Sequence, residues 1–246
     1  MVKLPKKVVN CPLLEAIFEI RYDSEYPSDA VFGMLYTSIK DYFKDIKPQT
    51  QPILQLPEAV RQQDPNLRYQ AYYKLSKENL SLSIGPRALI FSNIEPYLGL
   101  ESLSNFFSEI LSSIKSTSVL SMIERIGLRY INVFDNKILD HINLGIKIGG
   151  NDIVEESTNF RTEINDDGFT KILQIANAIN VSIKGKSKIA SVIDIDCLYN
   201  INEDANSFFN KYSQIIELAH QKEKELFYSL LKVPFLESLN PKYEED

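Results

Sequence analysis

Apolar and polar residues alternate along several segments of the chain, with the period of two that is typical of strands with one buried face. The clearest segment covers residues 13–22. One of its faces holds Ala16, Phe18, Ile20 and Tyr22. Its other face holds Glu15, Ile17, Glu19 and Arg21. Similar alternation predicts further strands over residues 68–76, 80–84, 88–91, 122–134, 158–164, 170–184 and 188–198.

Other segments repeat their apolar residues at the spacing of a helix face. A helix start at Pro27 precedes the first stripe, which consists of Phe32, Leu35, Ile39, Tyr42 and Phe43. Further stripes predict helices over residues 100–114 and about 204–232, the latter ended by Pro234, with a short helical turn at 137–142. Residues 49–66 contain several prolines and predict a loop that can include a short strand. Because the strand connections have hairpin length, the pattern predicts an α+β fold, a mainly antiparallel sheet with helices packed on one face.

The chain contains an internal sequence repeat. When Arg21 is aligned with Arg129, residues 18–22 match residues 126–130. Both segments consist of a large apolar residue, any residue, a second large apolar residue, Arg and Tyr. Residues 105–108 match residues 207–210 around a Phe-Phe pair. The sequence therefore predicts one domain, 1–246, in which a β-α-β-β-β-α unit occurs twice, over residues about 10–117 and 121–233. Residues 234–246 are acidic and predict a solvated tail.

Composition narrows the functional classes. Twenty-seven Lys and Arg against 33 Asp and Glu give a net charge of −6, which argues against nucleic acid or an anionic membrane as a partner of the whole protein. Two cysteines and two histidines offer little material for a zinc site or a disulfide framework. No apolar run approaches the roughly 20 residues that span a bilayer, and no signal-peptide pattern is found. A cytoplasmic protein without metal or cofactor is expected.

The polar face of the predicted sheet is rich in arginine. It carries, on it or beside it, Arg21, Arg68, Arg87, Arg125 and Arg129. One interpretation is a structural ladder of cross-strand ion pairs, with acidic members Glu15 and Glu19 and basic members Arg125 and Arg129. The other interpretation is a binding surface, because arginine recognises carboxylates and phosphates in a bidentate manner. Gly127, between two of these arginines, indicates a bulge or the close approach of another segment.

The sequence contains no complete catalytic set. Asp194 and Asp196 share one face of a predicted strand, as in magnesium sites and acid–base pairs, but no third ligand is identifiable nearby and a structural or interface role is favoured. His220 lies on the apolar stripe of the last predicted helix and is expected to be buried and hydrogen-bonded. The Gly-Lys-Ser run at 185–187 lacks the first glycine of a phosphate-binding loop, since residue 180 is asparagine. An enzyme is therefore the less favoured class.

Four motifs follow one another along the chain. They are N-x-P-L-x-E-A-x-x-E-I-R at Asn10–Arg21, R-I-G-L-R-Y-x-N at Arg125–Asn132, D-I-D at Asp194–Asp196, and the late His220 on a long helix. In these motifs the chain resembles a sporadically distributed family of uncharacterised bacterial proteins of similar length. The resemblance spans nearly the whole chain and implies a bacterial accessory protein associated with mobile or defence operons. It implies no reaction and no catalytic residues.

These observations favour a non-enzymatic binding or assembly protein of a bacterial operon, of the defence or toxin–antitoxin type. It would engage a protein partner, or a second copy of itself, through the polar sheet face. The candidate residues are Glu15, Glu19, Arg21, Arg87, Arg125, Gly127, Arg129, Asn132, Asp194 and Asp196. The alternative is a small-ligand or nucleotide-binding domain with a cavity between sheet and helices, where Arg87, Arg129 and Asp194 would contact the ligand.

Overall fold

The computed structural model describes residues 4–243 except 66, 136, 154–156 and 184. The chain divides into two compact units that alternate along the sequence. Unit 1 comprises Met1–Glu15, Arg129–Cys197 and Leu218–Asp246, and unit 2 comprises Ala16–Leu128 and Leu198–Glu217. Both units combine antiparallel strands with helices, so the predicted α+β class is confirmed. The borders of the units differ from those of the two predicted repeats.

Three strands and one helix contribute residues to both units. They are β2 (Leu13–Asp23), β7 (Met122–Phe134), β12 (Lys186–Asp204) and α4 (Ala205–Leu230). β7 has the predicted bounds, and β2 extends one residue beyond them. β12 is longer than the predicted strand and continues to the start of α4, which begins one residue after the predicted position. The period-two alternation thus located the three strands, and the apolar stripe at helical spacing located α4.

In unit 2 the strands lie in the order β12-β7-β2-β6-β5-β4-β3. The bounds of the remaining strands are β3 (Gln49–Thr50), β4 (Tyr73–Lys77), β5 (Leu80–Ile84) and β6 (Ala88–Ile94). These four strands pair antiparallel in chain order. The predicted hairpin between residues 77 and 80 joins β4 to β5. Unit 2 is therefore built on a largely consecutive antiparallel sheet.

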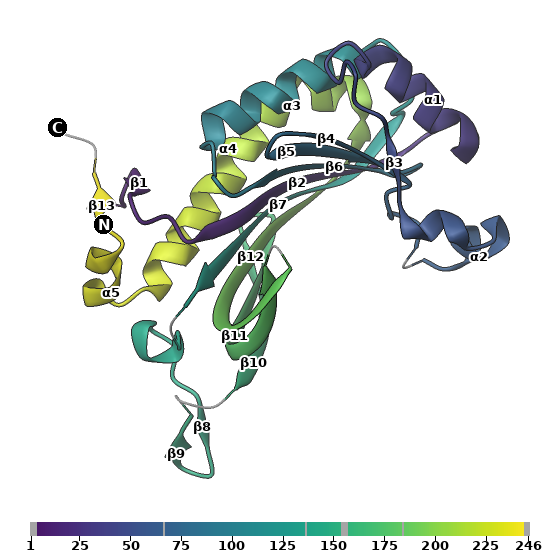
Figure 1. Cartoon of the computed structure of the whole chain (residues 1–246). Coiled ribbons are helices and arrows are strands. Elements are labelled where there is room, and N and C mark those ends of the chain that lie inside the picture. Colours follow the sequence, from purple (N-terminus) through teal and green to yellow (C-terminus); the bar gives the residue numbers. More distant parts are fainter. Residues whose placement is uncertain (1–3, 66, 136, 154–156, 184, 244–246) are drawn as a thin grey trace. The chain divides into compact units, whose positions relative to one another are not determined.

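Two helices of unit 2 bury the apolar face of this sheet. α1 (Ser28–Ile39) and α3 (Leu100–Lys115) lie on one side of it (Figure 1). At the centre, the ring centroid of Phe18 lies 6.0 Å from that of Phe91 and 4.7 Å from that of Phe107. The four residues predicted for the apolar face of β2, Ala16, Phe18, Ile20 and Tyr22, are at most 1% exposed. Phe32, expected on the buried stripe of α1, is only half-buried and stacks on Tyr73 with centroids 3.8 Å apart.

The segment between β3 and β4 differs from the prediction. Residues 49–66, expected to be a loop that can include a short strand, contain the short strand β3 and, beyond the prediction, the 3₁₀ helix η1 (Pro52–Gln55) and α2 (Glu58–Gln63). The strand expected from residue 68 begins at Tyr73 instead. The N–H of Leu67 donates to the carbonyl of Asp64, and that of Gln70 to the carbonyl of Leu67. The chain turns here because these local hydrogen bonds take the place of ladder hydrogen bonds.

We call residues 67–72 the turning segment. Gly85 lies just before β6, where the turning segment packs against the chain. A Cβ atom on residue 85 would lie 2.3 Å from the carbonyl oxygen of Gln70, so a larger residue requires a backbone shift. The carbonyl of Gly85 also accepts a 2.8 Å hydrogen bond from the hydroxyl of Tyr22. Gly85 thereby sets the path of the segment that carries Arg68 and Tyr69.

In unit 1 the strands lie in the order β10-β11-β12-β7. β10 (Thr158–Asp166) and β11 (Phe169–Ile183) form an antiparallel hairpin. Its two turn residues, Asp167 and Gly168, have φ values of 47° and 82°, as a type I′ turn requires. The predicted Asp-Asp-Gly turn and the strands on both sides of it are confirmed. Side chains on the buried face of this sheet include Leu173, Ile175, Ile193 and Ile195.

Smaller elements complete unit 1. They are β1 (Lys7–Val8), η2 (Leu139–His141), β8 (Lys147–Ile148), β9 (Asn151–Asp152), α5 (Val233–Ser238) and β13 (Pro241–Lys242). Pro234, expected to end α4, lies in the first turn of α5, where a missing N–H is tolerated. The expected solvated tail also differs, because Phe235 and Leu239 are buried and β13 pairs with β1. Apolar residues among the acidic ones thus hold this segment against unit 1.

The two halves of the chain share part of their strand order. β4, β5 and β6 follow one another and end beside β2, whereas β10, β11 and β12 follow one another and end beside β7. After β2 the chain forms α1, but at the corresponding point after β7 it forms only η2. η2 lies where the sequence predicted a short helical turn at 137–142, and internal duplication stays a prediction.

Candidate functional site

Six polar residues of unit 2 form one network, which we call the Tyr69 cluster. Its members are Glu19, Arg21, Arg68, Tyr69, Glu124 and Arg125. The carboxylate of Glu19 accepts hydrogen bonds from Nε of its neighbour Arg21 at 2.6 Å and from a terminal nitrogen of Arg125 at 2.8 Å. The second of these is a predicted cross-strand pair between β2 and β7, and it is confirmed.

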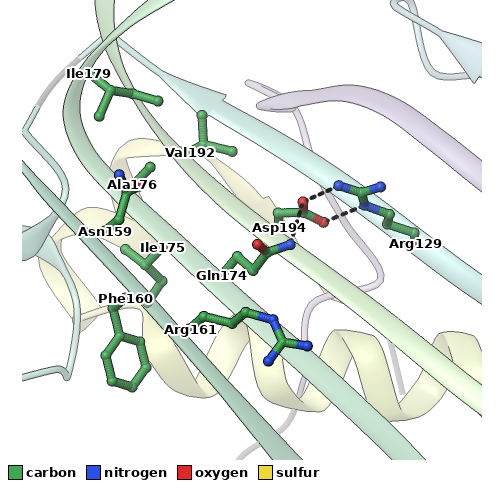
Figure 2. A pocket seen from close by; sticks show the side chains of 10 residues that line it. All are labelled: Arg129, Asn159, Phe160, Arg161, Gln174, Ile175, Ala176, Ile179, Val192 and Asp194. Atoms are coloured by element: carbon green, nitrogen blue, oxygen red, sulfur yellow. Dashed lines mark hydrogen bonds and ion pairs between the residues drawn. The ribbon is translucent and has the colours of Figure 1, made fainter. Parts of the chain in front are cut away.

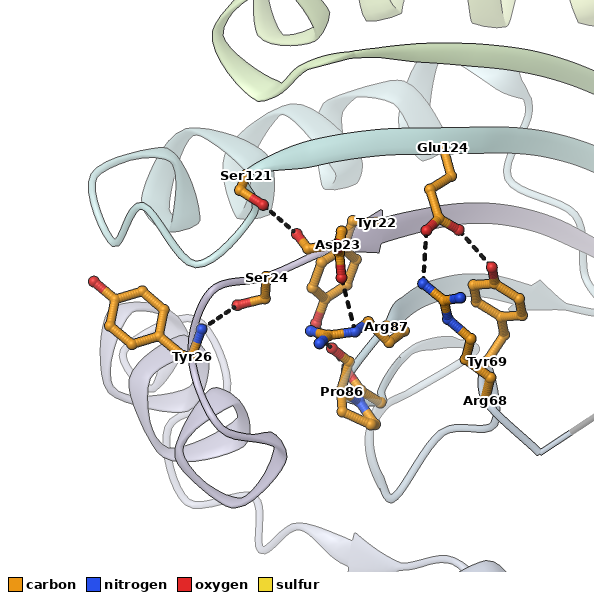
Figure 3. Close-up of polar contacts among 11 residues, drawn as sticks. Tyr22, Asp23, Ser24, Tyr26, Arg68, Tyr69, Pro86, Arg87, Ser121 and Glu124 are labelled. Carbon is orange, nitrogen blue, oxygen red and sulfur yellow. Dashed lines mark hydrogen bonds and ion pairs between the residues drawn. The ribbon is translucent and has the colours of Figure 1, made fainter. Parts of the chain in front are cut away.

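Residues of the turning segment close this network (Figure 3). The hydroxyl of Tyr69 donates to one carboxylate oxygen of Glu124, and Arg68 donates to the other at 2.9 Å. The guanidinium of Arg21 lies over the ring of Tyr69, 4.2 Å from its centroid. Burial and the bond to Glu124 raise the pKa of Tyr69, which stays a neutral donor. Arg68 and Tyr69 reach the polar face from a turn and not from the predicted strand.

The polar face of unit 2 is therefore partly covered by its own chain. A shallow pocket of about 260 Å³ remains at this place, and it is lined by Glu19, Arg21, Pro65, Tyr69, Gln70 and Ile90. Arg87 lies outside it and pairs with Asp23 at 3.0 Å, where β2 ends (Figure 3). Gly127 is buried within β7. In this unit the arginines mainly bind carboxylates of the same unit.

Unit 1 presents a more open site, which we call the Arg129 pocket (Figure 2). It has a volume of about 310 Å³ and is lined by Arg129, Asn159, Phe160, Arg161, Gln174, Ile175, Ala176, Ile179, Val192 and Asp194. These residues come from β7, β10, β11 and β12. The apolar side chains of Ile179 and Val192 lie at one end, and the charged pair of Arg129 and Asp194 lies at the other (Figure 2).

Arg129 and Asp194 form a bidentate pair. Nε of Arg129 donates to one carboxylate oxygen of Asp194 at 2.8 Å, and a terminal nitrogen donates to the other at 2.5 Å. Gln174 donates to the same carboxylate at 3.4 Å. The side chain of Asp194 is 9% exposed, whereas that of Arg129 is 38% exposed. The acid therefore anchors a guanidinium that remains open to an approaching molecule.

Carboxylate side chains stabilise the positive charge of Arg129. Its pKa is raised first by the hydrogen bonds to Asp194, and further by the charges of Asp194, Asp196 and Glu15, against an opposing effect of burial. Three carboxylates thus act on one guanidinium. Arg161, at the opposite wall of the pocket, is 53% exposed and pairs with Glu163 at 2.6 Å, so it adds no net charge.

Four predicted residues, Glu15, Arg129, Asp194 and Asp196, are thus brought together in unit 1. Glu15 was one of two expected partners of Arg129, but the bidentate partner of this arginine is Asp194. Asn132 is buried and donates to the carbonyl of Ile193 at 3.4 Å, so it supports the pairing of β7 with β12. Sequence reasoning missed Gln174 and Arg161, because only the register between strands places them beside Asp194.

His220 shares a hydrogen bond of 3.0 Å between its Nδ1 and the hydroxyl of Tyr130. Burial, and to a smaller extent Lys224, lowers the pKa of His220 to about 4. The imidazole is therefore neutral near pH 7. The expected hydrogen-bonded histidine on the apolar stripe of the last helix is confirmed, although its ring is not fully buried.

A buried carboxyl group lies one helical turn further along α4. Glu223 is 4% exposed, and burial raises its pKa to about 8. Burial raises the pKa of Cys11 and raises that of Cys197 to about 12, and the charge of Glu223 adds a smaller increase to both. The thiol of Cys197 is therefore protonated near pH 7 and is a poor nucleophile. The period-3.6 pattern alone does not distinguish Glu223 from a solvated residue.

Among the residues that the structure describes, no group of three or more His, Cys, Asp or Glu side chains is arranged to hold a metal ion. The described helices include none that is both long and apolar enough to cross a membrane. Comparison with protein-family models and with curated proteins finds no match to this chain. The functional argument therefore depends on the geometry of the sites themselves.

Proposed function

We propose that this protein is a non-enzymatic binding protein that engages a protein partner through the polar face of its sheet, with the Arg129 pocket as the principal contact. The observation that carries the proposal is the open, bidentate Arg129–Asp194 pair at the end of a pocket with apolar walls. Arginine is enriched among the residues that dominate interface binding energy, and the core of an interface is more apolar than its rim. The lining residues can pair and orient a partner group.

The partner group is a lysine or arginine side chain. Its aliphatic stem would lie along Ile179 and Val192, and its charged end would approach Asp194 from the side that Arg129 leaves open. The charges of Glu15 and Asp196 favour this polarity, since both act on Arg129. From the family resemblance, we take the partner to be the product of a neighbouring gene in a bacterial operon of the defence or toxin–antitoxin type.

Co-purification tests this function. The chain would be expressed together with the products of its neighbouring genes, and capture would be compared between the unaltered chain, the double variant Glu15→Gln with Asp196→Asn, and the control Asp152→Asn. The double variant keeps the bidentate pair but removes two negative charges. Capture should weaken in the double variant and persist in the control, whose carboxylate is 64% exposed on β9. Equal capture by all three chains, or capture of no product, contradicts the proposal.

A small cationic ligand is the second candidate. It is favoured by the convergence of Arg129, Asp194 and Gln174 on a pocket whose volume lies near the lower end of the range for ligand sites, about 300–1,000 Å³. Two features differ from the cavity expected from sequence, because the pocket is formed by strands alone and Arg87 is not among its lining residues. A thermal-shift screen with amines, guanidines and nucleotides separates the cases. Stabilisation by a cation without any protein partner supports this candidate.

A further inference from the structure

β10 is the last strand on its side of the sheet in unit 1. β11 pairs with one of its edges, and no strand that the structure describes pairs with the other. The strand has nine residues and contains no proline. An edge of this length presents a row of backbone N–H and C=O groups that can pair with another strand. By contrast, the last strand in unit 2, β3, has two residues and is followed closely by Pro52.

The register of the hairpin shows which backbone groups face this edge. Asp166 and Phe169 flank the two-residue turn and therefore form a hydrogen-bonded pair. Hydrogen-bonded and non-hydrogen-bonded pairs alternate along an antiparallel ladder. Even-numbered residues of β10 consequently direct their N–H and C=O groups toward β11. The groups directed to the outer edge belong to Asn159, Arg161, Glu163 and Asn165.

The side chains of β10 are complementary to those of a second β10 strand that runs antiparallel to it. In an antiparallel pair centred on Thr162, Arg161 lies opposite Glu163 of the second copy, and Glu163 lies opposite Arg161 of the second copy. Phe160 then lies opposite Ile164 of the second copy, on the other face of the sheet. Opposite charges and apolar pairs at directly opposed positions are both favourable. The same register joins the outward backbone groups in hydrogen-bonded pairs.

Neighbouring registers lack this complementarity. The backbone N–H and C=O groups at the outer edge can form hydrogen bonds only when the two opposed residues are both odd-numbered. The nearest alternative registers are therefore centred on Arg161 or on Glu163. Each of these places a charged residue opposite its own copy, which is unfavourable. Arg161 and Glu163 are each 53% exposed and already form an ion pair within the strand. In the register centred on Thr162, the four charges of two copies alternate in sign.

We propose that two copies of this chain associate by antiparallel pairing of their β10 strands about a two-fold axis at Thr162. The sheet of unit 1 then continues from one copy into the other through about eight backbone hydrogen bonds. The row of apolar side chains formed by Phe160 and Ile164 continues with it. This association uses the strand edge and does not depend on the function proposed for the Arg129 pocket.

Sedimentation equilibrium of the full chain and three variants tests the proposal. The unaltered chain should show a monomer–dimer equilibrium, with a dimer of twice the monomer mass of 28.2 kDa. Glu163→Arg places a new guanidinium opposite Arg161 of the second copy, and the dimer dissociation constant should rise roughly tenfold or more. The charge-swapped variant, Arg161→Glu with Glu163→Arg, restores both opposed pairs and should return to within about threefold of the original constant. Lys147→Glu, a reversal at a residue 67% exposed on another hairpin, is the control and should leave it unchanged.

Glu163→Pro provides a test that does not depend on charge. Proline removes an N–H that faces the outer edge and leaves the ladder between β10 and β11 intact, so far-UV circular dichroism should be unchanged while the dimer is lost. A strictly monomeric unaltered chain overturns the proposal. A dimer that is indifferent to both Glu163→Arg and Glu163→Pro overturns it as well, as does a folded charge-swapped variant that fails to dimerise.

Discussion

Asp194→Asn removes the charge from the carboxylate that anchors Arg129 while keeping the size of the side chain. The carboxylate accepts two hydrogen bonds from the guanidinium, at 2.8 and 2.5 Å, and is 9% exposed. Hydrogen bonds to charged groups contribute about 1.5–3 kcal/mol each. Asparagine keeps one acceptor oxygen, so one of the two bonds is lost. Water compensates part of this loss because Arg129 is 38% exposed, and we expect the free energy of unfolding to fall by about 1–2 kcal/mol.

Urea unfolding, followed by far-UV circular dichroism and tyrosine fluorescence, measures this change, since the chain has no tryptophan. Asp152→Asn is the matched control, because its pair with Lys147, at 3.3 Å, is exposed on both sides and should contribute less than about 0.5 kcal/mol. A double-mutant cycle with Arg129→Met isolates the energy of the pair. A loss for Asp194→Asn no larger than that of the control, together with a coupling energy near zero, refutes the assigned anchoring role.

Four further substitutions test the packing and the electrostatics. Glu223→Gln should stabilise the protein at pH 8 by about 3–5 kcal/mol. The carboxyl keeps its proton up to a pKa of about 8 in the folded state but loses it near 4.5 in the unfolded state, so the stability of the unaltered chain falls as the pH rises between these values. The midpoint of urea unfolding should therefore fall with pH in the unaltered chain and lose this dependence in the variant. Gly85→Ala should destabilise the protein by about 1–3 kcal/mol, because its Cβ would lie 2.3 Å from the carbonyl oxygen of Gln70. Gly33→Ala should stabilise it, because residue 33 lies within α1 and a Cβ there would have no atom within 4 Å. Thermal melts that rank the two variants alike contradict this packing. Tyr69→Phe removes the donor to Glu124 and should cost about 1 kcal/mol in urea unfolding, and no change would show that the hydroxyl is equally well solvated by water.

The strands and the longer helices could be predicted because their signals are local. In β2, every second residue is apolar, and this period alone places Phe18 and Ile20 on the buried face. The stripe of α3 likewise needs no information beyond the spacing along its own sequence. A pattern of period two does not contain the order of strands in a sheet. For that reason the sequence predicted Glu15 or Glu19 as partners of Arg129, whereas Asp194 is opposite only because β12 lies beside β7.

The turning segment shows a second limit. Residues 68–72 alternate like a strand, yet Tyr69 leaves the ladder because its hydroxyl and ring find partners on β7 and β2. Those partners are far away in sequence, and Gly85 is required to let the turn approach the sheet. The same holds for α5, where buried Phe235 and Leu239 outweigh an acidic composition. Tertiary contacts decided these elements against their local pattern.

The two interpretations of the arginine-rich face apply to different parts of it. Arg125 shares the carboxylate of Glu19 with Arg21, and the segment around Tyr69 lies against this group, so its guanidinium mainly stabilises unit 2. Arg129 is held by a single buried carboxylate and opens onto a pocket that no segment of the described chain fills. The two arginines lie four residues apart on one strand, on the same face. Coverage by the chain itself, and not the residue type, therefore distinguishes Arg125 from Arg129, and this difference supports the proposal of recognition at Arg129.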